Sequence, residues 1–179
     1  MPNTNRNLIV ASEKLFLYNN ILNEFDKDHD ILTFSYNPKI SKNANAKAIY
    51  RNLNKHLQGK YDKIVFMGLE SDCNLLHELY IDKALTFDAA IFVNYRKSEI
   101  HGLDLRTQQN TAHHTPIYSF SVRRNDTVQP LAYLKEHHNV PSLFRSIRSK
   151  RLAKEIYGVV VYGIYELNFL EGTPSKLIK

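Results

Sequence analysis

The segment Lys63 to Asp72 constrains the fold of this chain more than any other segment. Its first half, Ile64 to Met67, is a run of apolar residues and predicts a buried strand. Gly68 then favours a sharp turn, and the apolar residues after Cys73 recur at the spacing of a helix. A buried strand that leads through a tight turn into a helix indicates a sheet with helices packed against it. The turn would lie at the carboxyl end of the strand, where such sheets bind ligands.

Apolar runs and helical periods alternate along the rest of the chain. They predict strands at 7–10, 31–36, 64–67, 88–94, 116–122 and 157–162, and helices at 14–27, 41–57, 73–83, 130–138 and 141–156. Residues 96–115 are polar without a clear period, and we predict a loop or an insertion there. The alternation implies right-handed crossovers and a three-layer α/β/α sandwich with a mostly parallel sheet. With 179 residues, the chain is expected to form a single domain over 1–179.

Composition excludes several classes of protein. No apolar run approaches the roughly 20 residues of a membrane helix, and no apolar signal segment opens the chain, so we expect a cytoplasmic protein without membrane contact. The single cysteine, Cys73, excludes an internal disulfide and a multi-cysteine metal site. The pairs His113–His114 and His137–His138 lack the spacing of metal ligands. We therefore predict no metal and no cofactor.

The net charge of +6 is concentrated in one part of the sequence. Residues 96–154 hold eleven Lys or Arg and four Asp or Glu, whereas residues 1–95 hold eleven of each. Within the basic part, Arg145, Arg148 and Arg151 are spaced to share a face of the helix predicted at 141–156. An ordinary solvated face is the simplest interpretation. An acidic protein partner comes next, and binding of phosphate or nucleic acid comes last.

The order of the predicted elements resembles the α/β-hydrolase family over most of the chain. Asn7 to Glu13 looks like the strand and loop that carry the family's oxyanion motif, and Lys63 to Leu76 looks like its nucleophile elbow and following helix. Thr115 to Pro130 is similar to the strand and loop that bear the acidic triad member. The turn from Gly163 to Asn168 would correspond to the place of the catalytic histidine. The resemblance implies a compact α/β-hydrolase fold.

The reacting groups depart from the family pattern. In the elbow motif G-x-S-x-G, the first glycine matches Gly68, Glu70 takes the place of the serine and Asp72 that of the second glycine. By the same match, Asp126 takes the position of the triad's acid. The last histidine of the chain is His138, which precedes the last predicted strand. The resemblance thus implies a degenerate member that lacks the usual Ser-His pair.

Three functions follow from these residues. The preferred one is a non-catalytic binding or accessory module, in which Glu13, Glu70 and Asp126 form an acidic rim for a protein partner or a small molecule. The first alternative is an atypical esterase or related hydrolase with the Glu70 carboxylate as nucleophile. The second is an anion or nucleic-acid binder that uses residues 145–154. Two more binding candidates are Tyr165 and Ser71, although a helix cap is the simpler role for Ser71.

Overall fold

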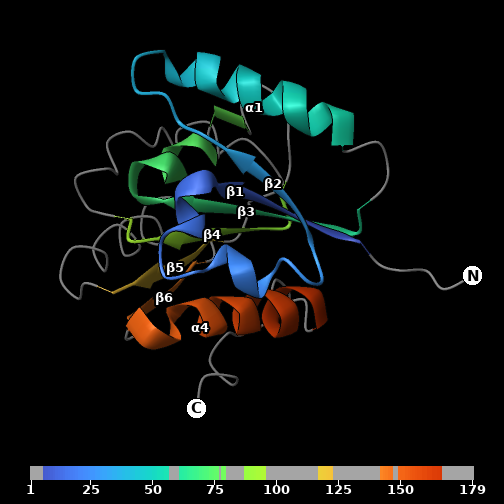
Figure 1. Ribbon diagram of the computed structural model, residues 1–179, viewed down its shortest axis with the longest axis vertical. Helices are drawn as coiled ribbons and strands as arrows, with labels where there is room; N and C mark the ends of the chain where they lie inside the picture. The colour runs from blue at the N-terminus through green and yellow to red at the C-terminus, as the bar shows by residue number, and fades with distance from the viewer. Residues whose placement is uncertain are drawn as a thin grey trace, which may run out of the picture.

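The computed structural model describes residues 6–56, 61–76, 78–79, 87–95, 117–122, 142–146 and 149–166. These residues form one six-stranded sheet in the order β2-β1-β3-β4-β5-β6, and all neighbouring strands are parallel. The strands are β1 Asn7–Ser12, β2 Asp30–Phe34, β3 Lys63–Leu69, β4 Ala89–Val93, β5 Ile117–Ser121 and β6 Ser142–Ser146. Helical segments cover both faces of the sheet (Figure 1). The predicted three-layer sandwich with a parallel sheet is confirmed.

The order of the strands creates a switch point between β1 and β3. From β1 the chain crosses to the edge strand β2, returns past β1 to form β3, and then proceeds in one direction to β6. Because β-α-β crossovers are right-handed, the connection that follows β1 covers one face of the sheet and the connection that follows β2 covers the other. Ligands on such sheets bind beyond the carboxyl ends of the strands that flank the switch. The carboxyl ends of β1 and β3 are therefore the place to look for a site.

Helix α1, Lys42–His56, covers one face of the sheet. The hydroxyl of Ser41 caps this helix by accepting a hydrogen bond from the backbone N–H of Ala44 at 3.1 Å. The apolar side of the helix packs on residues that point to this face from β1, β2 and β3, among them Phe34 and Phe66, whose rings stack 5.5 Å apart. The buried residues of α1 itself are Asn45, Ala46, Ile49 and Leu53. Their spacing is that of one helix face, which is why the sequence predicted this helix well.

The opposite face is covered by two short 3-10 turns and a helix, whose buried side chains belong to one apolar cluster. These elements are η1 Glu13–Phe16, η2 Leu22–Glu24, and α4 Leu152–Gly158 with its π-helical continuation η7 Val159–Glu166. The helix predicted at 14–27 is wrong. Asn19 and Asn20 have φ angles of 52° and 53°, a left-handed conformation that a right-handed helix cannot contain. The segment therefore folds as separate turns around the buried side chains of Leu15, Leu22 and Phe25.

The predictions for the carboxyl-terminal part of the chain are also wrong. Residues 142–146 form the strand β6 instead of the first half of a helix, and residues 157–162 are helical instead of forming the last strand. Leu152, Ile156 and Val160 are fully buried and recur at helical spacing, so packing on the sheet overrides the local β-branched run 159–161. The loop predicted at 96–115 and the helix predicted at 130–138 lie outside the described residues.

This rearrangement removes the predicted basic helix face. Arg145 lies on β6 and Arg151 in the 3-10 turn η6, Ser149–Arg151, while Arg148 lies outside the described residues. Residues on a strand and on a following turn do not share a helix face, so the proposed i, i+3, i+6 alignment is wrong. No helix in the described ranges is long and apolar enough to cross a membrane.

Candidate active site

Glu70 occupies a strained position directly after β3. It is the first residue of the 3-10 turn η3, Glu70–Asn74, and its φ angle is 52°. Four non-glycine residues in the described part of the chain have positive φ, and the other three are asparagines, which tolerate this conformation best. For an ordinary side chain it costs about 1–2 kcal/mol. Strain of this kind is characteristic of functional sites, and here it marks the apex of a sharp turn.

Gly68 makes the turn possible. A Cβ atom added to Gly68 would lie 2.8 Å from both the backbone N and the Cα of Cys73. The turn η3 is thus folded back so closely on the end of β3 that no side chain fits at position 68. This close return leaves Glu70 half-buried at the carboxyl end of β3, with the exposed Ser71 next to it. The geometry is that of a nucleophile elbow with a carboxylate at the apex.

Polar side chains collect at the same edge of the sheet. Ser12, Glu13 and Lys14 end or follow β1, Ser35 follows β2, and Asn94 follows β4. Since all strands are parallel, their carboxyl ends lie at one edge, and β1 and β4 are the two neighbours of β3 in the sheet. The loops after β1 and β4 therefore flank the turn that carries the apex carboxylate.

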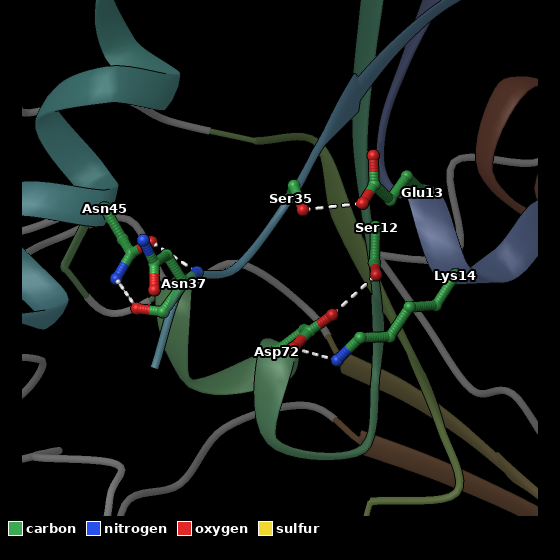
Figure 2. Close-up of polar contacts among 7 residues, drawn as sticks. All are labelled: Ser12, Glu13, Lys14, Ser35, Asn37, Asn45 and Asp72. Atoms are coloured by element: carbon green, nitrogen blue, oxygen red, sulfur yellow. Dashed lines mark hydrogen bonds and ion pairs between the residues drawn. The ribbon is translucent and has the colours of Figure 1, made fainter. Parts of the chain in front are cut away.

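Asp72 links the turn η3 to the loop after β1. Its side chain is fully buried, and its carboxylate accepts hydrogen bonds from Ser12 Oγ at 2.5 Å and from Lys14 Nζ at 3.2 Å (Figure 2). Ser12 is also buried, whereas the side chain of Lys14 is 54% exposed. A buried charge must be paired, and Asp72 is paired by one neutral donor and one cation. Sequence reasoning missed this contact, because it joins residues 60 and 58 positions apart.

Glu13 does not take part in this cluster. Its carboxylate accepts a hydrogen bond from Ser35 Oγ at 2.6 Å, and Figure 2 shows it turned toward β2 while Lys14 is turned toward Asp72. Glu13 therefore ties the end of β1 to the residue that follows β2. The third member of the predicted acidic rim, Asp126, lies outside the described residues.

A second set of contacts supports the turn from the β4 side. Tyr95 donates its hydroxyl hydrogen to Asn74 Oδ1 at 2.9 Å, and both residues are buried. The preceding residue, Asn94, donates from its side chain to the Tyr18 hydroxyl and accepts from the backbone N–H of Val122 at 3.1 Å. The turn η3 is thus held through Asp72 on one side and through Asn74 on the other.

The remaining candidates belong to other elements or lie outside the described part. Arg151 is exposed in η6, and Tyr165 belongs to η7. Residues 163–166 of the turn predicted at 163–168 are helical, and the last strand of the described part is β6. The residues that directly follow β6 in the sequence are Ile147, Arg148 and Ser149.

The described histidines lie at the opposite edge of the sheet. His29 immediately precedes β2, and His56 ends α1 ahead of β3, so both are at the amino ends of strands. The other six of the eight histidines fall outside the described ranges. Among described residues, no group of three or more His, Cys, Asp or Glu side chains could hold a metal ion.

Several solved structures resemble this architecture, and those reported below are named as thioesterases or hydrolases. The type II thioesterase BorB from the borrelidin biosynthetic cluster matches with a TM-score of 0.58 at 13% identity, covering 92% of each chain. MGS-M2, an α/β hydrolase from a Medee basin deep-sea metagenome library, matches with a TM-score of 0.57 at 11% identity, and the match covers 99% of this chain and 94% of MGS-M2. The RedJ thioesterase from the prodiginine pathway of Streptomyces coelicolor matches with a TM-score of 0.51 at 10% identity, and the match covers 87% of this chain and 85% of RedJ.

The fold is α/β-hydrolase-like. No protein-family model and no curated protein matches the sequence, so the likeness is one of structure.

The comparison corrects the function preferred from the sequence. A non-catalytic binding module is contradicted, because the structural neighbours are thioesterases and hydrolases. They favour the first alternative, an esterase or related hydrolase.

Proposed function

We propose that this protein is a hydrolase of ester-type bonds, and of thioesters in particular, in which the Glu70 carboxylate attacks the acyl carbon. The observation that carries the proposal is the φ angle of 52° at Glu70, directly after β3. The turn sets this residue at the carboxyl end of the sheet at a cost in backbone strain. An elbow with that geometry serves to present a reacting group to substrate.

The proposed reaction needs only three reactants, which are the Glu70 carboxylate, a thioester and water. One Glu70 oxygen forms a bond to the acyl carbon, the C–S bond breaks, and the thiolate departs with its electron pair. The product is an anhydride between the acyl group and the glutamate. Water then adds to a carbonyl of the anhydride, releases the carboxylic acid as its anion, and returns Glu70 to its ionised form. The protons lost by water go to the departed thiolate and to solvent.

The degenerate triad favours a thioester over an oxygen ester or an amide. The sequence has no serine at the apex, and no histidine follows Ser142–Ser146, the last strand of the described part. The proposed reaction therefore uses no imidazole after this strand as general acid, and the leaving group departs unprotonated. A thiol has a pKa of about 8.5 and leaves readily as thiolate, whereas an alkoxide is a far poorer leaving group. The thioesterases among the structural neighbours support the same substrate class.

The proposal is tested with the purified full-length chain and a series of acyl-coenzyme A thioesters, with thiol release followed by a chromogenic disulfide. We expect turnover by the wild type and a loss of about 10³-fold or more in Glu70→Gln. Glu13→Gln is the matched control, because Glu13 is a glutamate at the same edge of the sheet whose carboxylate is bonded to Ser35. Activity that survives unchanged in Glu70→Gln, or a wild type inactive on every thioester, would contradict the proposal.

A second measurement separates a nucleophile from a general base. Turnover in water enriched in ¹⁸O places the label in Glu70 when water attacks the glutamyl carbonyl of the anhydride. Peptide mass spectrometry then detects a gain of the isotope in the peptide that contains Glu70. Label in Glu70 would assign it as the nucleophile, whereas unlabelled Glu70 would mean that water attacks the acyl carbon, either of the anhydride or of the thioester itself.

A further inference from the structure

Attack by Glu70 on an acyl carbon creates a negative charge on the acyl oxygen that must be stabilised. The carbonyl π electrons move onto the acyl oxygen, and the resulting oxyanion forms beside a carboxylate nucleophile. An enzyme of this kind needs hydrogen-bond donors or a cation aimed at that oxygen. The loop after β1 is Ser12-Glu13-Lys14 and contains no glycine. Its acidic member faces Ser35, and its basic member faces the turn η3.

Lys14 is a cation in direct contact with this turn. Its Nζ lies 3.2 Å from Oδ1 of Asp72, two residues beyond Glu70 in the same tight turn. An ammonium carries three N–H donors, and this contact uses one of them. The side chain is 54% exposed, so solvent, and with it a substrate, can reach Lys14.

The ion pair between Lys14 and Asp72 differs from an ordinary surface ion pair in the burial of its acid. Asp72 is fully buried and stands where the elbow motif has its second glycine, and it is fixed independently by Ser12 Oγ at 2.5 Å. An exposed pair between two mobile side chains holds no defined position. Here one partner is immobile, so the ammonium is tethered to a fixed point next to the apex.

We propose that Lys14 is a catalytic residue that binds the acyl oxygen of the thioester and stabilises the oxyanion, and that Asp72 is its positioning residue. The inference rests on the proposed hydrolase function. In the step itself, the Glu70 oxygen bonds to the acyl carbon, the carbonyl electron pair moves to oxygen, and a Lys14 N–H donates to that oxygen without transferring its proton. Collapse of the intermediate re-forms the carbonyl and expels the thiolate.

The first test is kinetic and uses Lys14→Gln and Lys14→Arg, with Lys47→Gln on the exposed side of α1 as control. Removal of one oxyanion donor typically lowers kcat by about 10²–10³-fold. We expect such a loss in Lys14→Gln with KM changed little, partial recovery in Lys14→Arg, and no change in the control. Because Lys14 is half exposed, these variants are expected to fold. Wild-type kcat in Lys14→Gln would overturn the inference while leaving the role of Glu70 intact.

The second test is independent of turnover. A trifluoromethyl-ketone analogue of acyl-coenzyme A carries the carbonyl that becomes an oxyanion on attack, whereas the matching thioether lacks it. Calorimetry should show that Lys14→Gln loses about 10²-fold in affinity for the ketone and keeps its affinity for the thioether. Asp72→Asn should show the same selective loss, which a general loss of stability would not produce. Equal loss for both analogues, or no loss, would overturn the assignment. A wild type that neither turns over thioesters nor binds either analogue would refute both proposals.

Discussion

The Oγ atom of Ser12 lies 2.5 Å from the buried carboxylate of Asp72, so the last residue of β1 is hydrogen-bonded to the turn that follows β3. The two strands are neighbours in the sheet, and the winding of the chain reverses between them. This one bond therefore joins the two loops that flank the switch point. The other carboxylate oxygen of Asp72 is bonded to Lys14, and Glu70 occupies the apex of the same turn.

The two partners of Asp72 should contribute unequally to stability. Ser12→Ala removes the buried donor of a fully buried carboxylate and should lower the free energy of unfolding by about 1–3 kcal/mol. Lys14→Ala should cost at most about 1 kcal/mol, because the Lys14 side chain is 54% exposed and solvent replaces it. Urea denaturation of both variants measures the difference. A larger cost for Lys14→Ala than for Ser12→Ala would show that the ion pair, and not the hydroxyl, holds the carboxylate.

Gly68 and Gly158 should respond in opposite directions to the same substitution. Gly68→Ala forces a Cβ to within 2.8 Å of the Cys73 backbone, and overpacking of this kind costs about 1–3 kcal/mol. Gly158→Ala meets nothing within 4 Å and lies in α4, where alanine should stabilise by about 0.5–1 kcal/mol. Thermal denaturation of the pair provides the comparison. Equal behaviour of the two variants would contradict the close return of η3 onto β3.

Glu70 should show that its backbone is strained. Glu70→Gly removes the Cβ that disfavours a φ of 52°, whereas Glu70→Ala keeps it and also deletes the carboxylate. We expect the glycine variant to be more stable than the alanine variant by about 1 kcal/mol, and both to be inactive. Chemical denaturation of the two variants checks the order. If alanine were the more stable, the apex would not be held in the left-handed region in solution.

His29 should make stability depend on pH. The ring packs against Phe25 and Tyr157, with ring centroids 5.1 and 6.2 Å away, and burial lowers the pKa of His29 below its usual 6.5. The unfolded chain therefore binds a proton more readily than the folded one, and the stability present above pH 6.5 is lost as pH falls toward the lowered pKa.

Urea midpoints measured between pH 7.5 and pH 5 test this dependence. The decrease on acidification should be smaller in His29→Phe, which keeps an aromatic ring in this place. His56→Gln, at the exposed end of α1, is the control and should follow the wild type. A decrease of equal size in His29→Phe would assign the acid sensitivity to other groups.

Local signals in the sequence predicted most of the sheet and the elbow. The continuous apolar runs at Ile64–Met67 and Ala89–Val93 indicate buried parallel strands, because both faces of these strands are covered. The turn at Gly68 was readable because a glycine after such a run marks a close backbone approach. In these places the information lies within about ten residues of chain.

The predictions from the sequence were wrong where contacts between residues far apart in the chain determine the structure. The run Val159–Val161 favours a strand locally, but the buried helix face through Ile156 and Val160 packs it against the sheet. The pair Asn19–Asn20 interrupts a helical period that is otherwise convincing. In the site, no local pattern connects Ser12 or Lys14 with Asp72, because only the strand order makes them neighbours.

The two described histidines could not serve a serine placed at the elbow. Glu70→Ser would introduce an apex hydroxyl, yet His29 and His56 lie at the amino ends of strands, at the opposite edge of the sheet, and could not take its proton. The residues that directly follow β6 in the sequence, Ile147, Arg148 and Ser149, include no imidazole either. Among these positions, the group best suited to acyl transfer is therefore a carboxylate, which needs no base to become a nucleophile.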